Sequence, residues 1–245
     1  MAAAVVVTAC CSLVSVASAT QAVAQSDIAG KAVFLDPGHG GAGGAALSRQ
    51  VTNGRNGTKD CGTTGTSTSD GFPEHTFTWD VVQLVNANLQ ARGVRTELSR
   101  NDDSGSAPCV DERARMANAM HPDAIVSIHA DGGPAGGRGF HVNYSSPPLN
   151  DAQRGPAMQL ASVMRNALVA GQFQPSTYIG TDGMYGRADL AGLNLADYPA
   201  ILVELGNMKN NGEAAQMESP DGRARYAAAV TQGIVDYLSA TSAPG

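Results

Sequence analysis

The sequence predicts one α/β domain built on a twisted, mainly parallel central sheet with helices on both faces. Short apolar runs bounded by turn residues alternate with longer segments whose apolar residues recur at helical spacing, the pattern of strand–helix–strand units. Three of the apolar runs end in a residue that can bind a metal or move a proton: His39, His129 and Glu204. Because the carboxyl ends of parallel strands meet at one edge of a sheet, we expect these side chains to lie near one another.

The predicted strands are five short apolar runs: 32–35, 94–99, 123–131, 139–145 and 200–207. One predicted helix is opened by Pro73 and Glu74 and closed by Gly93, and three more span 108–120, 150–171 and 220–239. Residues 41–72 are dominated by Gly, Ser, Thr, Asn and Asp and show no periodicity. We therefore expect a long loop there, of the kind that is functional or mobile.

The N-terminus predicts export. Residues 2–24 carry no charge, are rich in small and apolar residues, and contain two A-x-A patterns. They are typical of a signal peptide, cleaved after Ala19 or Ala24, and we expect the protein in the periplasm, cell wall or medium. Residues 25–245 then form one domain without an appended module, and no later stretch approaches the roughly 20 apolar residues of a membrane span.

The net charge excludes two classes of binding partner, and the cysteine content predicts a disulfide. A formal net charge of −6 argues against nucleic acid and against anionic membrane surfaces. Cys61 and Cys109 are the cysteines outside the predicted signal peptide, and in an exported protein we expect them to form a disulfide. We expect a monomer.

Two histidines stand apart from the other three. His39 and His129 each follow a predicted buried strand, and Glu74 at a helix start could complete a His-Glu-His set. Three protein ligands with one open position is the arrangement of catalytic zinc sites. From the residues alone, this metal site and separate structural roles stay equally open. A structural role is favoured for the remaining histidines, which are His75, His121 and His141.

Glu204 is a carboxylate inside an apolar strand, where burial without a partner is costly. Two explanations stay open. It forms a structural ion pair with an arginine such as Arg113 or Arg115. Alternatively, it is a general base that takes a proton from a metal-bound water.

Several motifs in order carry a family resemblance: "VFLDPGHGG", "EHTFTWDVVQLVNANLQARGVRTELSR", "ERARMANAM", "AIVSIHAD", "GFHVNYS" and "AILVELGNMKNN". Together they resemble the zinc-dependent N-acetylmuramoyl-L-alanine amidases of the Amidase_3 family, which cut bacterial peptidoglycan. The similarity spans residues 31–240. The chain departs from the family pattern in its long insertion around Cys61, and at Asn207 and Met208, where an apolar pair is common.

The resemblance implies that His39, Glu74 and His129 bind one Zn²⁺ and that Glu204 is the catalytic glutamate. It implies peptidoglycan or a muropeptide as substrate, with a role in wall remodelling, daughter-cell separation or recycling. The same zinc chemistry could serve a carboxypeptidase or a sugar deacetylase. A non-catalytic wall-binding regulator that kept the fold is the third alternative.

Four further residues are candidates for supporting roles. Asp131 could orient a ligand imidazole through its second nitrogen, or be a turn residue. Asp36 could brace His39, or only cap the turn. Arg100 and Arg113 occupy positions characteristic of the family, and they are interpreted as structural or substrate-positioning.

Overall fold

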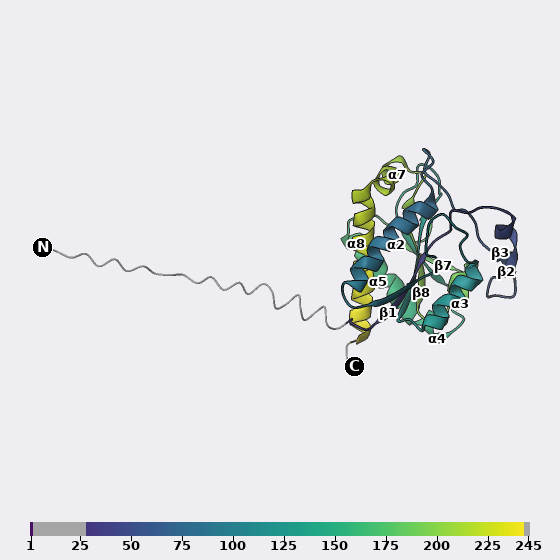
Figure 1. Ribbon diagram of the computed structural model, residues 1–245, viewed down its shortest axis with the longest axis horizontal. Helices are drawn as coiled ribbons and strands as arrows, with labels where there is room; N and C mark the ends of the chain where they lie inside the picture. The colour runs from purple at the N-terminus through teal and green to yellow at the C-terminus, as the bar shows by residue number, and fades with distance from the viewer. Residues whose placement is uncertain (2–27, 243–245) are drawn as a thin grey trace.

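A six-stranded sheet forms the centre of the computed structural model, which describes residue 1 and residues 28–242 (Figure 1). The strand order is β4-β1-β5-β8-β6-β7. The strands are β1 (Ala32–Pro37), β4 (Arg95–Leu98), β5 (Ala124–Asp131), β6 (His141–Ser145), β7 (Met184–Arg187) and β8 (Ala200–Asn207). The predicted signal peptide and its cleavage sites lie outside the described residues.

The sheet is mainly parallel, as predicted. Strand β1 runs parallel to β4 and β5, β5 parallel to β8, and β6 parallel to β7. The exception is β6, which is antiparallel to β8. Strands β1 and β5, which precede the predicted metal ligands His39 and His129, therefore end at the same edge of the sheet. Glu204 on β8 lies near that edge as well.

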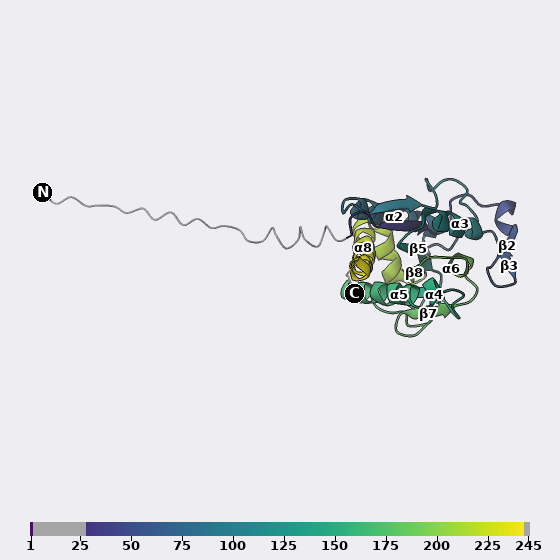
Figure 2. The same ribbon diagram turned by 90° about the horizontal axis from the view of Figure 1, so that it is seen from below.

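The two faces of the sheet are covered unequally. Helices α2 (Glu74–Gln90), α5 (Pro156–Ala170) and α8 (Pro220–Ser242) bury one face in a large apolar core. The other face carries α3 (Val110–Met120) and the single turn α6 (Ala191–Asn194) over a much smaller apolar cluster. Figure 2 shows α2, α5 and α8 on one side of β5 and β8, with α3 and α6 on the other.

Successive side chains of β1 point to opposite faces of the sheet, so this strand contributes residues to both apolar clusters. Val33 and Leu35 belong to the large core, whereas Ala32 and Phe34 belong to the small cluster. Because side chains alternate along a strand, Asp36 projects to the thinly covered face, and so do Ser127, His129 and Glu204 in the paired register. The chemically useful residues thus lie where few helices cover the sheet.

The predicted loop of residues 41–72 is partly ordered secondary structure, so that expectation was wrong in part. It contains the 3-10 helix η1 (Ala45–Ser48) and an antiparallel hairpin of β2 (Gln50–Thr52) and β3 (Thr58–Asp60). These strands have three residues each, and two of the three in each are exposed, so they show no apolar alternation. Asn56 and Gly54 take left-handed backbone angles at the hairpin turn, which their residue types favour.

Other differences concern short elements. The predicted helix 150–171 is interrupted at Gly155 and Pro156, so it becomes α4 (Asp151–Arg154) and α5. Proline at the first position of a helix is favourable, since its missing N–H would have no partner there. The edge strand β7, the turn α6 and α7 (Asn211–Glu218) were not predicted. No helix in the described ranges is both long and apolar enough to cross a bilayer.

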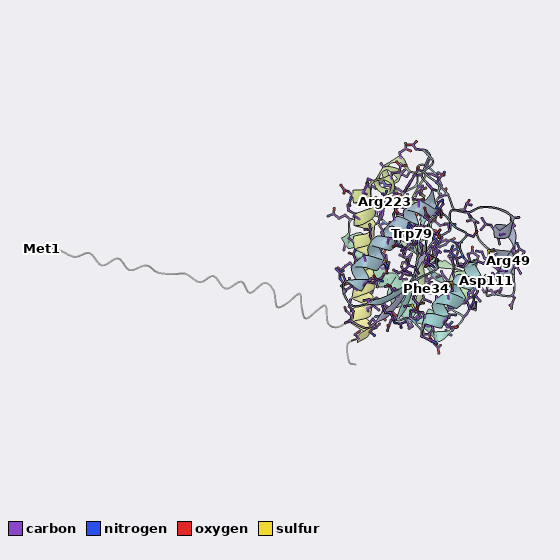
Figure 3. The ribbon with its side chains drawn as sticks, viewed as in Figure 1. Met1, Phe34, Arg49, Trp79, Asp111 and Arg223 are labelled. Atoms are coloured by element: carbon purple, nitrogen blue, oxygen red, sulfur yellow. A yellow bond between two sulfur atoms is a disulfide. The ribbon has the colours of Figure 1, made fainter. Side chains whose placement is uncertain are left out.

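The predicted disulfide is present and joins the hairpin to α3. Cys61 and Cys109 are bonded, with Cα atoms 4.4 Å apart and 48 positions apart in sequence. The Val110 N–H donates to the Cys61 carbonyl over 2.9 Å, and the Cys61 N–H donates to the Arg49 carbonyl over 2.7 Å. Figure 3 shows Arg49 and Asp111 at the side of the molecule where the hairpin meets α3.

We expect the double variant Cys61→Ser, Cys109→Ser to lose up to about 4 kcal/mol of unfolding free energy, because the crosslink restricts a long loop of the unfolded chain. Urea denaturation of both proteins would measure the difference. Alkylation followed by mass spectrometry is the control. Modification of both cysteines without reductant, or an unchanged urea midpoint, would contradict the assignment.

Candidate metal centre and active site

His39 is presented by a tight turn at the end of β1. Its backbone lies in the left-handed region, with φ 62°, a conformation that is strained for a non-glycine residue. The turn is held by its neighbours: the Gly38 carbonyl accepts from Thr78 Oγ1 at 2.8 Å, and the His39 carbonyl accepts from Arg113 Nη2 at 2.7 Å. The imidazole is therefore aimed by backbone contacts on both sides of the strand end.

Glu74 and His129 reach the same point from α2 and β5. Glu74 is buried at the first position of α2. Its Oε1 accepts from the Ala130 N–H at 3.1 Å, and its Oε2 accepts from the Thr66 N–H at 2.9 Å. These two backbone donors fix the carboxylate between β5 and the 41–72 segment.

Three donor atoms converge at this point. His39 Nε2 lies 3.1 Å from Glu74 Oε1, and His129 Nδ1 lies 3.0 Å from the same oxygen. The two imidazole nitrogens are 3.1 Å apart. Tetrahedral bonds of about 2.0–2.1 Å would place donors about 3.3 Å apart, close to what is observed. Two imidazole nitrogens facing one carboxylate oxygen fit a bound cation, so this group could hold a metal ion.

Hydrogen bonding also selects the metal-binding tautomer of His39. Its Nδ1 donates to the Thr63 carbonyl at 2.9 Å, which leaves the Nε2 lone pair free for an ion. Gly65 packs closely against both Glu74 and His39. A Cβ at this position would lie 2.5 Å from Glu74 Oε2 and 2.9 Å from the His39 ring. The 41–72 segment thus has a defined role: it braces two of the three donors.

The electrostatics of the group favour an anionic carboxylate. Burial alone would raise the pKa of Glu74, but the two imidazoles that face its carboxylate, His129 and His39, outweigh burial and hold the pKa well below its usual range. Burial lowers the pKa of His129, which favours the neutral imidazole that ligates metals.

Glu204 lies beside the triad on β8, directly opposite His129 in the sheet register. Burial is the main cause that raises its pKa, and the negative charges of Glu74 and Asp131 raise it further. Its Oε2 is buried without a hydrogen-bond partner. Of the two explanations left open for Glu204, the structural ion pair with Arg113 or Arg115 is wrong, because Arg113 pairs with Asp36 and Arg115 with Glu112.

A cleft of about 420 Å³ joins these residues. Its floor is the thinly covered face of the sheet, and its walls are the 41–72 segment, α3 and the region around α6. The donor triad and Glu204 line it together with mostly small and apolar residues, which include Phe34, Leu47, Ala107, Ala114, Ile125 and Leu193. A half-buried carboxylate next to a triad that could hold a metal ion, in such a cleft, is suited to hydrolysis of a polar bond.

Asp36 does not contact the His39 ring and does not cap the turn, but it supports the His39 backbone indirectly, through Arg113. Its carboxylate accepts from Arg113 Nη1 and Ser99 Oγ, each at 2.5 Å, and from Ser127 Oγ at 2.6 Å. Burial alone would raise its pKa, but Arg113 and the two serines outweigh burial and hold the pKa well below its usual range. The anion in turn fixes Arg113.

Both predicted arginines bind backbone carbonyls behind the site. Arg113 donates to the Pro37 and His39 carbonyls at 3.0 and 2.7 Å. Arg100 donates to the Pro37 carbonyl at 3.1 Å and to the His75 carbonyl at 2.7 Å. Trp79, labelled in Figure 3, stacks on the Arg100 guanidinium at 5.1 Å. These contacts support the structural interpretation.

Asp131 does not contact a ligand imidazole among the described interactions. Its carboxylate accepts from the Tyr178 hydroxyl at 2.9 Å. The Thr63 carbonyl orients the His39 imidazole instead. Tyr178 was not identified from the sequence as a residue near the site. Neither has a signal in the sequence, because a backbone carbonyl is independent of residue type and Tyr178 lies in an irregular segment.

A family model for N-acetylmuramoyl-L-alanine amidases, Amidase_3, matches residues 33–236. The chain belongs to this family. It is 58% identical to N-acetylmuramoyl-L-alanine amidase Rv3717 of Mycobacterium tuberculosis over 235 residues, which cover 96% of each chain.

Solved structures of amidases agree with the fold. The crystal structure of Ami1 from Mycobacterium smegmatis superposes with a TM-score of 0.86 at 59% identity, covering 87% of this chain and 99% of that one. AmiC2 of Nostoc punctiforme superposes with a TM-score of 0.65 at 26% identity, covering 85% of this chain and 97% of that one. This chain therefore shares its α/β architecture with both of these amidases.

Gly38→Ala should abolish metal binding and activity. A Cβ at this position would overlap the His129 ring and lie 2.6 Å from its Nδ1. Gly155→Ala is the matched control, since a Cβ there meets nothing within 4 Å. Elemental analysis of the bound metal, with circular dichroism to verify folding, would compare the variants. Full metal occupancy in a folded Gly38→Ala protein would contradict the geometry described here.

Proposed function

We propose that this chain is a zinc-dependent hydrolase of the amide bond between N-acetylmuramic acid and L-alanine in peptidoglycan. The observation that carries the proposal is the convergence of His39, Glu74 and His129 beside the half-buried carboxylate of Glu204 in one cleft. Family membership supports the bond cleaved, because a curated relative that is 58% identical to this chain is named for this activity.

The donor set fits zinc. Two imidazoles and one carboxylate, with space in the cleft for a further ligand, form the type of site found in catalytic zinc enzymes. When bound, the ion supplies a Lewis acid that polarises the amide carbonyl and makes water more acidic. His39, Glu74 and His129 hold it, and the Thr63 carbonyl keeps the His39 imidazole in the required tautomer.

Glu204 carries the proton in this proposal. Its carboxylate accepts a proton from the attacking water and then delivers that proton to the departing alanine nitrogen. The apolar surroundings and the neighbouring acids that raise its pKa make it a better proton acceptor than an exposed glutamate. Its Oε2 accepts no hydrogen bond from the described residues.

The proposed substrate indicates where in the cell the protein acts. A wall hydrolase acts outside the cytoplasm, and the Cys61–Cys109 disulfide is consistent with an oxidising compartment. We therefore propose that the chain is exported through the predicted signal peptide and that it acts as a monomer. A role in wall remodelling, cell separation or recycling follows from the bond cleaved.

The product assay distinguishes the alternatives. Purified peptidoglycan incubated with the zinc enzyme should release stem peptides with free L-alanine amino termini, detectable by labelling and mass spectrometry. Dialysis against a chelator should stop the release, and added Zn²⁺ should restore it. New peptide carboxyl termini would indicate a carboxypeptidase, free acetate a deacetylase, and no product at all a non-catalytic wall-binding protein.

Glu204→Gln should lower kcat by about 10²-fold or more, because the amide cannot accept the proton. The bound metal should remain, since Glu204 is outside the donor triad. Glu97→Gln on the exposed edge of β4 is the control and should retain activity. A Glu204→Gln enzyme with normal turnover would refute the role assigned to this carboxylate.

A further inference from the structure

His141 lies in a row of site residues that crosses three strands. His129 on β5 pairs with Glu204 on β8, and Glu204 pairs with His141 on β6. Directly opposite residues on adjacent strands project to the same face, and in an antiparallel pair their Cβ atoms lie about 4.5–5.5 Å apart. The His141 imidazole is therefore the side-chain neighbour of Glu204 on the side away from the metal triad.

Both partners of this pair have a buried atom without a hydrogen bond. His141 is 2% exposed, and its Nδ1 has no partner. Glu204 Oε2 has none either. Buried polar atoms are nearly always hydrogen-bonded, so two unpartnered atoms on directly opposed side chains indicate an interaction that forms in the working enzyme.

The side chains around His141 do not form a hydrogen bond with its Nδ1. Tyr178 and Tyr185 contact the imidazole edge-on, with ring centroids 6.4 and 6.1 Å away. The Tyr178 hydroxyl already donates to Asp131, and the Tyr185 ring lies under the Arg187 guanidinium. The aromatic rings therefore confine the imidazole without providing a hydrogen-bond partner for Nδ1.

The imidazole is neutral at physiological pH. Burial lowers the pKa of His141 to about 4, while Asp131 and Arg187 act on it in opposite directions. A neutral imidazole carries one N–H donor, so it can orient a carboxylate without neutralising its charge as a cation would.

We propose that His141 is a positioning residue that donates a hydrogen bond from Nδ1 to Oε2 of Glu204 and orients this carboxylate toward the metal triad. The inference rests on the proposed function, which gives Glu204 the proton-transfer step. With Oε2 held, Oε1 is left to accept the proton from water. Rotation of the carboxylate is then restricted by the neighbouring strand.

Two substitutions separate this role from packing. His141→Leu fills a similar volume without a donor, and His141→Asn places a side-chain amide where Nδ1 lies. The control is His121→Asn, because His121 follows α3 at the opposite sheet edge and its left-handed φ of 53° is one that asparagine tolerates. The readouts are kcat and KM on muramidase-digested peptidoglycan, bound zinc, and thermal midpoint.

We expect His141→Leu to lower kcat about 10- to 100-fold, as for other residues that orient the groups of a metal site, with KM changed by less than about twofold. Bound zinc should stay at the wild-type level, and His141→Asn should recover most of the lost kcat. If His141→Leu does not fold, His141→Gln replaces it, since its amide is displaced toward the Nε2 position and should not restore kcat.

Three results would overturn the inference: unchanged kcat in His141→Leu, loss of zinc together with activity, or equal losses in the Asn and Gln variants. Glu204→Gln is measured alongside these variants. If Glu204→Gln is fully active, the proposed function fails. If it is inactive while His141→Leu turns over normally, only the inference about His141 fails.

Discussion

The buried contact between Asp36 and Arg113 is the interaction on which the site depends. It holds a guanidinium against the turn that ends β1, where Arg113 binds the Pro37 and His39 carbonyls. The Thr78 hydroxyl donates a hydrogen bond to the carbonyl of Gly38, which lies between them. Three successive carbonyls are thus fixed by side chains, which holds His39 at φ 62°. A buried ion pair is stable only when its hydrogen bonds are complete, and Ser99 and Ser127 complete those of Asp36.

The unequal covering of the sheet creates the space for chemistry. Three helices fill one face with a continuous apolar core, whereas α3 and α6 leave the other face open near the strand ends. The 41–72 segment enters this space, anchored by the Cys61–Cys109 disulfide, and it supplies the Thr63 carbonyl and the Thr66 N–H to the triad. The crosslink therefore stabilises a wall of the cleft as well as the fold.

The two glutamates of the site are the same residue type in opposite electrostatic states. Glu74 faces two imidazoles and two backbone N–H donors, so its pKa is held low and it suits a cation. Glu204 faces apolar surroundings and other acids, so its pKa is raised and it suits proton transfer. The environments of the two carboxylates therefore favour the two different roles proposed for them. His141 extends the same logic to the neighbouring strand, where a neutral donor can orient the second carboxylate without discharging it.

The sequence by itself determined the alternation of strands and helices, the strand ends that carry His39, His129 and Glu204, the start of α2 at Glu74, and the pairing of two cysteines. These features follow from local periodicity, turn residues and side-chain chemistry, all of which are written in neighbouring residues. The short elements β2, β3 and β7 could not be found in this way, because strands of three or four partly exposed residues carry no apolar pattern.

Only the tertiary structure decided which groups surround the side chains of the site. Asp36 turned out to fix Arg113, Asp131 turned out to bind Tyr178, and the Thr63 carbonyl orients His39. The register that sets His141 opposite Glu204 depends on β6 running antiparallel to β8. Such contacts join residues far apart in the chain, several through backbone atoms that every residue possesses, so packing alone selects them.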